Sequence, residues 1–208
     1  MLNLTNLEKR VLEISYKKKL SHIGSCLNAV QVIDDCYASM QEGDKFVLSQ
    51  GHAFLALAVV LEKYKGLDAE KLVDEHGTHP NKNLEEDIYV STGSLGQGLP
   101  IAVGMAIADK AHNVYVVTSD GEMNEGSMWE ALRVAGDLRL ENLRIAVIAN
   151  GYSAYGKVDT ELLTQRIKLF YPSIVVPTDL FKFPEWLQSL KGHYVIMNDE
   201  QYKEVSNG

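Results

Sequence analysis

The sequence predicts an α/β protein of three layers, in which a doubly wound, mainly parallel sheet lies between helices on both faces. Two stretches rich in β-branched residues, 114–118 and 143–149, are typical of buried parallel strands. A helical segment over about 127–138 separates them, so the three together predict one strand–helix–strand crossover. At 208 residues the chain is long enough for one such domain and too short for two typical ones. We therefore expect a single domain over residues 1–208.

The chain before this crossover predicts a short strand among several helices. A stripe of apolar side chains predicts a helix over about residues 4–19, and a second helix begins near Ser25. A strand over 44–48 then leads through a Ser-Gln-Gly turn towards the next helix. The other helices of this half are expected at about 52–64, 68–76 and 99–110.

The chain after the crossover carries weaker signals. A helix over 159–170 is ended by Pro172, and a strand over 173–176 follows it. The last elements expected are a helix over 180–190 that contains Trp186, a strand over 193–197 and a frayed polar tail over 198–208.

Composition narrows the class of protein. A net charge of −8 argues against nucleic acid as the main partner, because phosphate backbones are bound by basic faces. No apolar run approaches the roughly 20 residues of a membrane span, and the amino terminus lacks the apolar centre of a signal peptide. The two cysteines, Cys26 and Cys36, do not form a CxxC pair and are expected to be reduced. These features predict a cytoplasmic protein that binds neither nucleic acid nor membranes.

Two polar side chains follow the strands of the crossover. Asp120 comes directly after the first strand and Asn150 after the second. Because open α/β sheets bind ligands at the carboxyl edge of their strands, we expect both side chains to face one crevice. Oxygen side chains with glycines beside them suit a hard cation that holds a phosphate ester. The alternative is an ordinary crossover whose strands end in polar turn residues.

The order of residues in this stretch resembles that of one protein family. Residues 120–132 read DGEMNEGSMWEAL, and an LENL segment precedes the second strand. This stretch resembles the thiamine-diphosphate motif of the transketolase family. Four more segments resemble that family in the same order: SHIGS at 21–25, KFVLSQGH at 45–52, HP at 79–80 and STGSLGQG at 91–98. The sequence departs from the family pattern at Ile23, Ser94, Ser119 and Ala149.

The resemblance implies a site for thiamine diphosphate and Mg²⁺, for which Ca²⁺ or Mn²⁺ could substitute. It implies that Asp120, Asn150 and the backbone carbonyl of Tyr152 hold the metal ion and, through it, the cofactor. The other residues implied to contact the cofactor are His52, Gly93, Ser94, Leu95, Gly121 and Glu122. The candidate catalytic residues are His22, His52 and His79, because imidazole titrates near neutral pH.

The resemblance also implies a partner subunit. In the family, the glutamate that activates the thiamine ring comes from a second, pyrimidine-binding domain, which 208 residues cannot also hold. The chain is therefore expected to be the N-terminal half of a split transketolase, in an α₂β₂ assembly acting on sugars or sugar phosphates. Glu125 and Glu130 match acidic residues near the family's subunit interface. Gly192-His193 is a loose match to a family turn whose histidine touches the active site.

Three other functions remain open on the sequence. The first is another thiamine enzyme, similar to a deoxyxylulose-phosphate synthase or to a 2-oxo acid dehydrogenase. The second is a non-catalytic paralogue, which Ser119, Ala149 and the short carboxyl-terminal segment motivate. The third is a nucleotide-binding Rossmann protein, although no G-x-G-x-x-G follows a first strand.

The histidine pair His76 and His79 could suggest a zinc site. The pair lacks a third histidine or a cysteine at the spacing of zinc ligands, so we do not expect zinc there.

Overall fold

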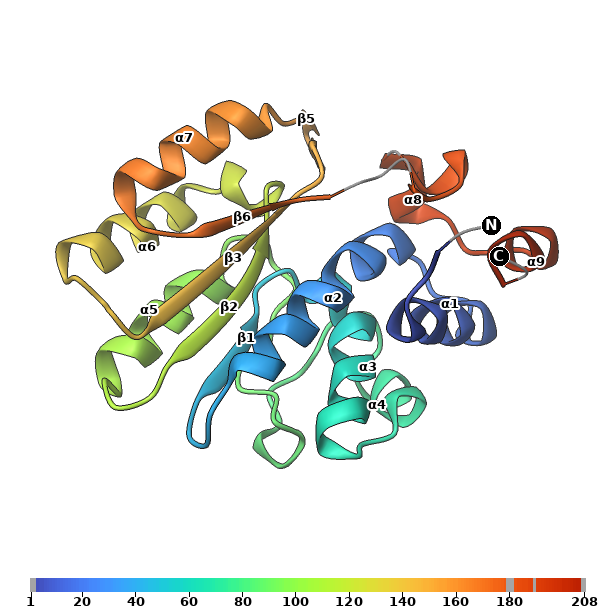
Figure 1. Ribbon diagram of the computed structural model, residues 1–208, viewed down its shortest axis with the longest axis horizontal. Helices are drawn as coiled ribbons and strands as arrows, with labels where there is room; N and C mark the ends of the chain where they lie inside the picture. Colours follow the sequence, from blue (N-terminus) through green and yellow to red (C-terminus); the bar gives the residue numbers. More distant parts are fainter. Residues whose placement is uncertain (1–2, 179–181, 189, 207–208) are drawn as a thin grey trace.

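The main sheet consists of parallel strands that lie side by side in chain order (Figure 1). The structure is a computed structural model, and it describes residues 3–178, 182–188 and 190–206. Within these ranges the strands of the main sheet are β1 (Lys45–Leu48), β2 (Val114–Ser119), β3 (Leu143–Ala149) and β6 (Ile174–Pro177). A separate antiparallel pair, β4 (Tyr152–Ser153) and β5 (Gly156–Lys157), follows β3.

Helices cover both faces of this sheet. One face is packed by α5 (Gly98–Ala108), α6 (Gly126–Asp137) and α7 (Thr160–Phe170). The other face is packed by α2 (Ile23–Ser39), behind which lie α1 (Asn6–Lys18), α3 (Phe54–Lys65) and α4 (Ala69–His76). Successive residues of β3 alternate between the two cores, since Ile145 faces α5 and Ala146 faces α2. The predicted three-layer α/β fold is confirmed.

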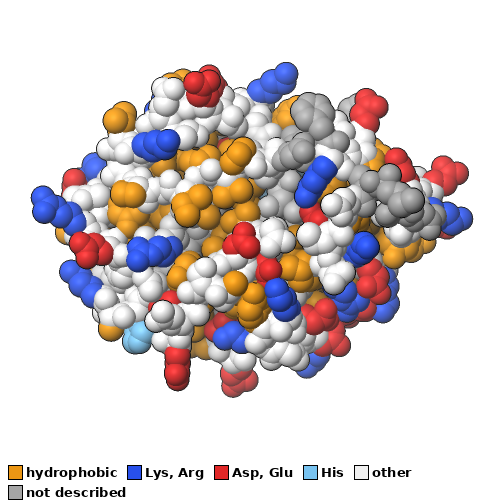
Figure 2. Space-filling model, in the orientation of Figure 1, with side chains coloured by type: hydrophobic (Ala, Val, Ile, Leu, Met, Phe, Trp, Pro, Cys, Tyr) orange, Lys and Arg blue, Asp and Glu red, His pale blue; other side chains and the backbone are white. Residues whose placement is uncertain are grey.

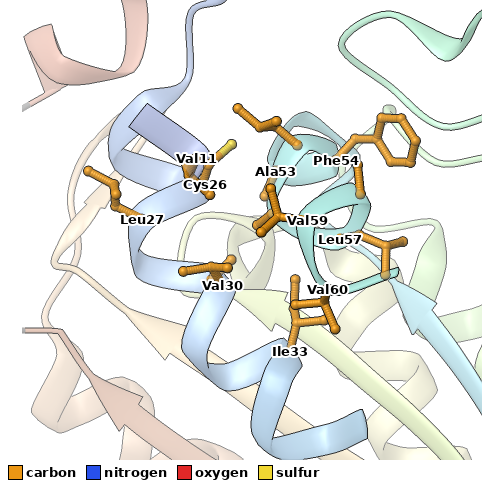
Figure 3. Close-up of a cluster of buried hydrophobic side chains, with 14 of the residues drawn as sticks. Val11, Cys26, Leu27, Val30, Ile33, Ala53, Phe54, Leu57, Val59 and Val60 are labelled. Atoms are coloured by element: carbon orange, nitrogen blue, oxygen red, sulfur yellow. The ribbon is translucent and has the colours of Figure 1, made fainter. Parts of the chain in front are cut away.

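The larger core fixes the position at which α2 and α3 begin. Figure 3 shows side chains of α1, α2 and α3 meeting in one cluster, with Val11, Val30 and Val60 among them. These three side chains have no exposed surface. Both α2 and α3 start beside residues that the sequence analysis assigns to the site, so this packing holds the amino ends of two helices in place.

The start of α1 shows how local sequence sets an element boundary. Thr5 Oγ1 accepts a hydrogen bond from the Glu8 N–H, and a Glu8 carboxylate oxygen accepts one from the Thr5 N–H at 2.8 Å. The other Glu8 carboxylate oxygen lies 2.6 Å from Lys182 Nζ. The capping box therefore starts the helix and also ties it to the segment that follows β6.

The carboxyl-terminal region differs from the sequence prediction. The predicted strand over 193–197 is wrong, because α8 (Leu190–Tyr194) occupies its first half and the rest is irregular. Met197 and Val195 instead pack against the core of α1 to α3, so their apolar character is satisfied by helices and not by a sheet. The helix predicted over 180–190 is also wrong, since the turn η5 (Glu185–Leu187) is the main element of its described part. Residues 180, 181 and 189 lie outside the described ranges.

The predicted frayed tail over 198–208 is wrong for most of its length. Residues Asp199–Ser206 form α9, which packs against α1 beside the amino terminus (Figure 1). The rings of Tyr16 and Tyr202 stack at 4.1 Å between centroids, and the Tyr16 hydroxyl donates to Asp199 at 2.8 Å. Val205 is buried, with 2% of its surface exposed. Apolar contact with α1 therefore orders a segment whose composition is mainly polar.

Among the described residues, no helix covers the part of the sheet beside α2 at β3 and β6. A groove of about 1270 Å³ runs there between α2, β3 and β6. It is lined by apolar side chains that include Val32, Ile174 and Val176, and Ile174 is 71% exposed. Figure 2 shows hydrophobic side chains gathered on this face. None of the helices in the described ranges combines the length and the apolarity that a membrane span requires.

We predict that Val205→Ala lowers the free energy of unfolding by about 2 kcal/mol, because it removes two buried methyl groups and leaves a cavity beside α1. Urea denaturation monitored by circular dichroism measures this change. The control is Lys203→Ala at an exposed position of the same helix, for which the midpoint should stay the same. Equal midpoints for both variants would contradict the docking of α9.

Candidate functional site

The loops that follow β2 and β3 meet at the carboxyl edge of the sheet. The Gly151 N–H donates to Asp120 Oδ2 at 2.6 Å, and the Tyr152 N–H donates to Asn150 Oδ1 at 2.8 Å. A Cβ atom on Gly121 would lie 3.4 Å from the Tyr152 carbonyl oxygen, so that oxygen faces the loop of Asp120. The structure thus brings together the three groups that the sequence analysis assigns to a metal ion.

Asp120 is a buried carboxylate without a cationic partner among the described residues. Its oxygens accept hydrogen bonds from backbone N–H groups, at 2.9 Å from Gly121 and at 2.6 Å from Gly151. Burial raises the pKa of Asp120 to about 6, and the backbone donors oppose that rise only in part. A divalent cation would supply the missing positive charge, and one carboxylate with amide and carbonyl oxygens suits Mg²⁺. The residues present therefore fit the implied metal.

A second kind of metal site is built from three or more acidic, histidine or cysteine side chains. Across residues 3–178, 182–188 and 190–206, no group of three such side chains is arranged to hold a metal ion. A magnesium site at Asp120 would have to use neutral oxygens and the oxygens of a bound phosphate.

The Glu122 carboxylate links segments that form the walls of the site. This residue begins the short turn η3 (Glu122–Asn124) and has no exposed surface. Its Oε1 accepts from Ser49 Oγ and from the Gly96 N–H, each at 3.0 Å, and its Oε2 accepts from Thr118 Oγ1 at 2.6 Å. Burial raises its pKa, an effect that these donors oppose. Three segments far apart in sequence are therefore held by one carboxylate, and a contact with a cofactor stays a prediction.

Ser119, one of the departures from the family pattern, is accommodated in this loop. Its φ is negative, and its hydroxyl accepts a hydrogen bond from the Glu122 N–H at 3.3 Å. Ala149, the departure that precedes Asn150, is a buried residue of β3 beside Pro177 of β6.

The glycine-rich loop over 93–98 packs tightly on the turn after β1. Gly96 has a φ of 79°, which a residue with a side chain rarely adopts. A Cβ on Gly98 would lie 2.4 Å from the Ser49 Cα, so only glycine allows this approach. Ser94 is exposed and Leu95 is half-buried at the wall of the pocket described below.

Three histidine rings form a cluster beside this loop. The ring centroids lie 5.5 Å apart for His22 and His52, 4.3 Å for His22 and His193, and 5.1 Å for His52 and His193. His193 stands in α8, and Ser25 Oγ lies 3.2 Å from its Nδ1. The sequence resemblance matched His193 only loosely, and the structure places it beside His22 and His52, two of the three histidines predicted to be catalytic.

His79 stands apart from this cluster. Its exposed ring lies over Gly93, where an added Cβ would be 3.1 Å from His79 Cδ2. Its neighbour His76 is an anchor for the same loop, because His76 Nε2 lies 2.7 Å from Glu86 Oε2 and its Nδ1 accepts from the Asn81 N–H. The two histidines therefore differ in role, and they do not form a pair.

The clustered histidines are neutral at pH 7. Burial, together with repulsion from neighbouring imidazoles, lowers the pKa of His22 to about 4 and that of His52 to about 3. Burial also lowers the pKa of His193. A neutral imidazole has one N–H donor and one acceptor nitrogen, so each ring can exchange a proton or hydrogen bond with a ligand.

A pocket of about 120 Å³ lies between these groups. Its walls include Gln50, His52, Gly121, Asn150, Leu187 and His193. Sites that enclose a whole cofactor-sized ligand usually measure about 300–1,000 Å³. This pocket can therefore enclose only one end of such a ligand, and a diphosphate is an end of suitable size.

Two predicted interface residues lie outside the pocket. Glu125 accepts a hydrogen bond from the hydroxyl of Tyr155 at 3.0 Å, and Tyr155 is 74% exposed. Glu130 is exposed and pairs with Arg133 of its own helix at 2.6 Å. A role for either residue at a subunit interface stays a prediction.

Comparison with known proteins gives a consistent result. Residues 25–173 match the family model described as "Transketolase, thiamine diphosphate binding domain". A protein of Phocaeicola vulgatus that is named as a subunit of apulose-4-phosphate transketolase is 38% identical over 161 residues, covering 67% of this chain and 56% of that protein. The 6-deoxy-6-sulfo-D-fructose transketolase subunit SqwG of Clostridium sp. strain MSTE9 is 32% identical, covering 90% of this chain and 72% of that protein.

Solved structures agree on the fold. The transketolase of Campylobacter jejuni superposes with a TM-score of 0.71 at 21% identity, covering 98% of this chain and 43% of that one. A Pichia stipitis transketolase mutant in complex with fructose 6-phosphate gives a TM-score of 0.72 at 22% identity, covering 97% and 40%. This chain thus spans just over half the length of the Phocaeicola protein and less than half of the solved transketolases.

We predict that Glu122→Ala lowers the free energy of unfolding by about 2–5 kcal/mol, because the Ser49 and Thr118 hydroxyls and the Gly96 N–H lose their buried acceptor. Glu122→Gln keeps one acceptor oxygen and should cost less. Urea denaturation measures both, with Glu141→Gln at an exposed site as the control. If Glu122→Ala unfolded at the same urea concentration as the control, Glu122 would not hold these loops together.

We also predict a change in the pH dependence of stability for His52→Asn. The unfolded chain protonates its histidines near pH 6.5, whereas folded His52 stays neutral down to about pH 3. Stability is therefore lost as the pH falls from 6.5 towards 3, with a slope of up to about 1.4 kcal/mol per pH unit for this group. His52→Asn should make the decline between pH 6 and 4 shallower in urea titrations. An equal slope in the two proteins would mean that folded His52 is already charged.

Proposed function

The chain belongs to the transketolase family, and we propose that it is the N-terminal, thiamine-diphosphate-binding subunit of a split transketolase. The observation that carries this proposal is the convergence of Asp120, Asn150 and the Tyr152 carbonyl beside a pocket sized for a diphosphate. The names of two relatives support it, since each is called a subunit of a transketolase. The reaction proposed is transfer of a two-carbon ketol unit from a ketose to an aldose.

In this proposal Asp120, Asn150 and the Tyr152 carbonyl hold Mg²⁺, and Gly121 lets the backbone approach the diphosphate. Mg²⁺ prefers six oxygens in octahedral geometry, so the diphosphate and water would complete its shell. When bound, thiamine diphosphate supplies the carbon nucleophile of the reaction. The rings would lie against Gly93, Ser94 and Leu95.

The histidines would interact with the substrate. A neutral imidazole can donate a hydrogen bond to a carbonyl oxygen and accept a proton from a hydroxyl, which is what ketol transfer requires of the protein. His22 and His52 are neutral at pH 7 because of burial and mutual repulsion, so each can donate one N–H to a carbonyl oxygen of the substrate. His79 lies over Gly93 and would face the reacting end of the cofactor.

The proposed enzyme needs a C-terminal, pyrimidine-binding subunit in an α₂β₂ assembly. The small size of the pocket supports this, because the remainder of the cofactor would have to be enclosed by another chain. Glu125 and Glu130 are proposed to lie near that interface. The substrates would be sugars or sugar phosphates, and the cytoplasm is the proposed compartment.

The experiment mixes this chain with a pyrimidine-binding subunit from the same genome, adds Mg²⁺ and thiamine diphosphate, and follows ketol transfer from a ketose donor. We predict activity only from the mixture, and a loss of at least 100-fold for Asp120→Asn, which removes the charge that holds the metal. Asp35→Asn, at an exposed site on α2, is the matched control and should keep full activity.

Four outcomes would contradict parts of the proposal. Full activity from this chain alone would exclude the split enzyme. Activity that survives Asp120→Asn would exclude the metal assignment. Turnover of pyruvate in place of a ketose would favour a related thiamine enzyme, and binding of cofactor with no turnover in any mixture would favour a non-catalytic paralogue.

A further inference from the structure

We propose that His76 is a positioning residue for His79. Its imidazole, as the neutral tautomer with the proton on Nε2, clips together the two ends of the segment that carries His79. The inference rests on the proposed function, because it takes His79 to face the substrate. No sequence motif assigns a role to His76, which is the last residue of α4 and is not among the described residues that line the pocket.

The His76 ring closes a turn around His79. His76 ends α4, and Gly77, with a φ of 72°, turns the chain out of the helix. The Asn81 N–H, five positions after His76, donates to His76 Nδ1 at 3.0 Å. His79 lies between these two points in the chain. One hydrogen bond from the His76 ring therefore ties both ends of the segment that contains His79.

The two polar contacts of the His76 ring define its tautomer. A backbone N–H can only donate, so the Nδ1 atom that accepts from Asn81 carries a lone pair and no proton. The proton of the neutral ring therefore lies on Nε2, which donates to Glu86 Oε2 at 2.7 Å. A ring with a proton on Nδ1 would set two N–H groups against each other at Asn81 and would open the clip.

The clip is anchored on the segment that carries His52. The His76 side chain is 7% exposed, and its ring meets the Phe54 ring edge-on, with 5.2 Å between the centroids and 64° between the planes. Phe54 has no exposed surface and is the first residue of α3, two positions after His52. The packing of His76 on Phe54 thus fixes the start of the His79 segment relative to His52.

His79 depends on the clip for its position. Its ring is exposed, lies over Gly93 and forms no hydrogen bond to another described residue. The nearest backbone restraint besides the clip is a long hydrogen bond, in which the Thr92 N–H donates to the Pro80 carbonyl at 3.3 Å. Loss of the His76 contact should therefore let the His79 ring move away from Gly93.

The first test observes the clip in the wild-type chain and needs no variant. The chain is labelled with ¹⁵N and studied at about pH 8, where an unperturbed histidine is neutral. An N–H···N hydrogen bond transmits a scalar coupling between its nitrogens, so we expect a cross-peak between the Asn81 amide nitrogen and His76 Nδ1. Long-range ¹H–¹⁵N spectra should show Nδ1 without a proton and Nε2 with one. Absence of the cross-peak, or a proton on Nδ1, would overturn the inference.

Hydrogen exchange at the Asn81 amide tests the clip with variants. His76→Leu removes the acceptor at similar volume and should speed this exchange about 10-fold, the factor expected for one hydrogen bond. His76→Asn places a side-chain oxygen near the position of Nδ1 and should restore most of the protection. His112→Leu, at a histidine whose side chain is 41% exposed, is the matched control and should leave Asn81 unchanged. Equal exchange in the wild type and His76→Leu would contradict the clip.

Ketol transfer in the two-subunit mixture shows whether the clip acts through His79. His76→Leu should lower kcat/KM for the ketose donor roughly 10- to 100-fold, because a misplaced group loses its near-attack geometry. In a His79→Ala background the same change should cost nothing further, since no ring remains to be positioned. Equal losses in both backgrounds would overturn the inference. If the cross-peak and the exchange results hold but no mixture transfers a ketol unit, the clip stands and the proposed function falls.

Discussion

The carboxylate of Glu122 is the constraint on which the geometry of the site depends. Its two oxygens accept hydrogen bonds from the turn after β1, from the loop before α5 and from the end of β2. The groups that donate these bonds are the Ser49 hydroxyl, the Gly96 N–H and the Thr118 hydroxyl. A buried charge is stable only when its hydrogen-bonding capacity is used, so the carboxylate and the three loops stabilise one another. The loop of Asp120 and the glycine-rich loop over 93–98 therefore keep a fixed relation without a ligand.

Much of the fold follows from local sequence. The strands β2 and β3, the helix between them and the position of Asp120 and Asn150 at one edge of the sheet are predictable, because β-branched runs and the geometry of a parallel crossover leave few alternatives. The starts of α1 and α7 follow from capping residues in the same way. His22 and His52 could be grouped from motifs, and the structure brings their rings to 5.5 Å.

The features that escaped prediction depend on distant contacts. The apolar residues around Val195 have the composition of a strand, but whether such a run pairs or packs depends on the surface that it meets, and here it meets helices. The polar segment of α9 is ordered by Tyr16 and by the burial of Val205. Local propensity cannot report any of these effects.

The contact between Ser25 and His193 has a consequence for the order in which the protein assembles. The two residues are 168 positions apart in sequence. At ribosomal speeds of about 5–20 residues per second, roughly 10–30 s separate their synthesis. The crossover that carries Asp120 can fold within that interval, whereas the histidine cluster cannot close until α8 arrives. A nascent chain would thus complete the loops of Asp120 and Asn150 before α8 supplies its wall of the pocket.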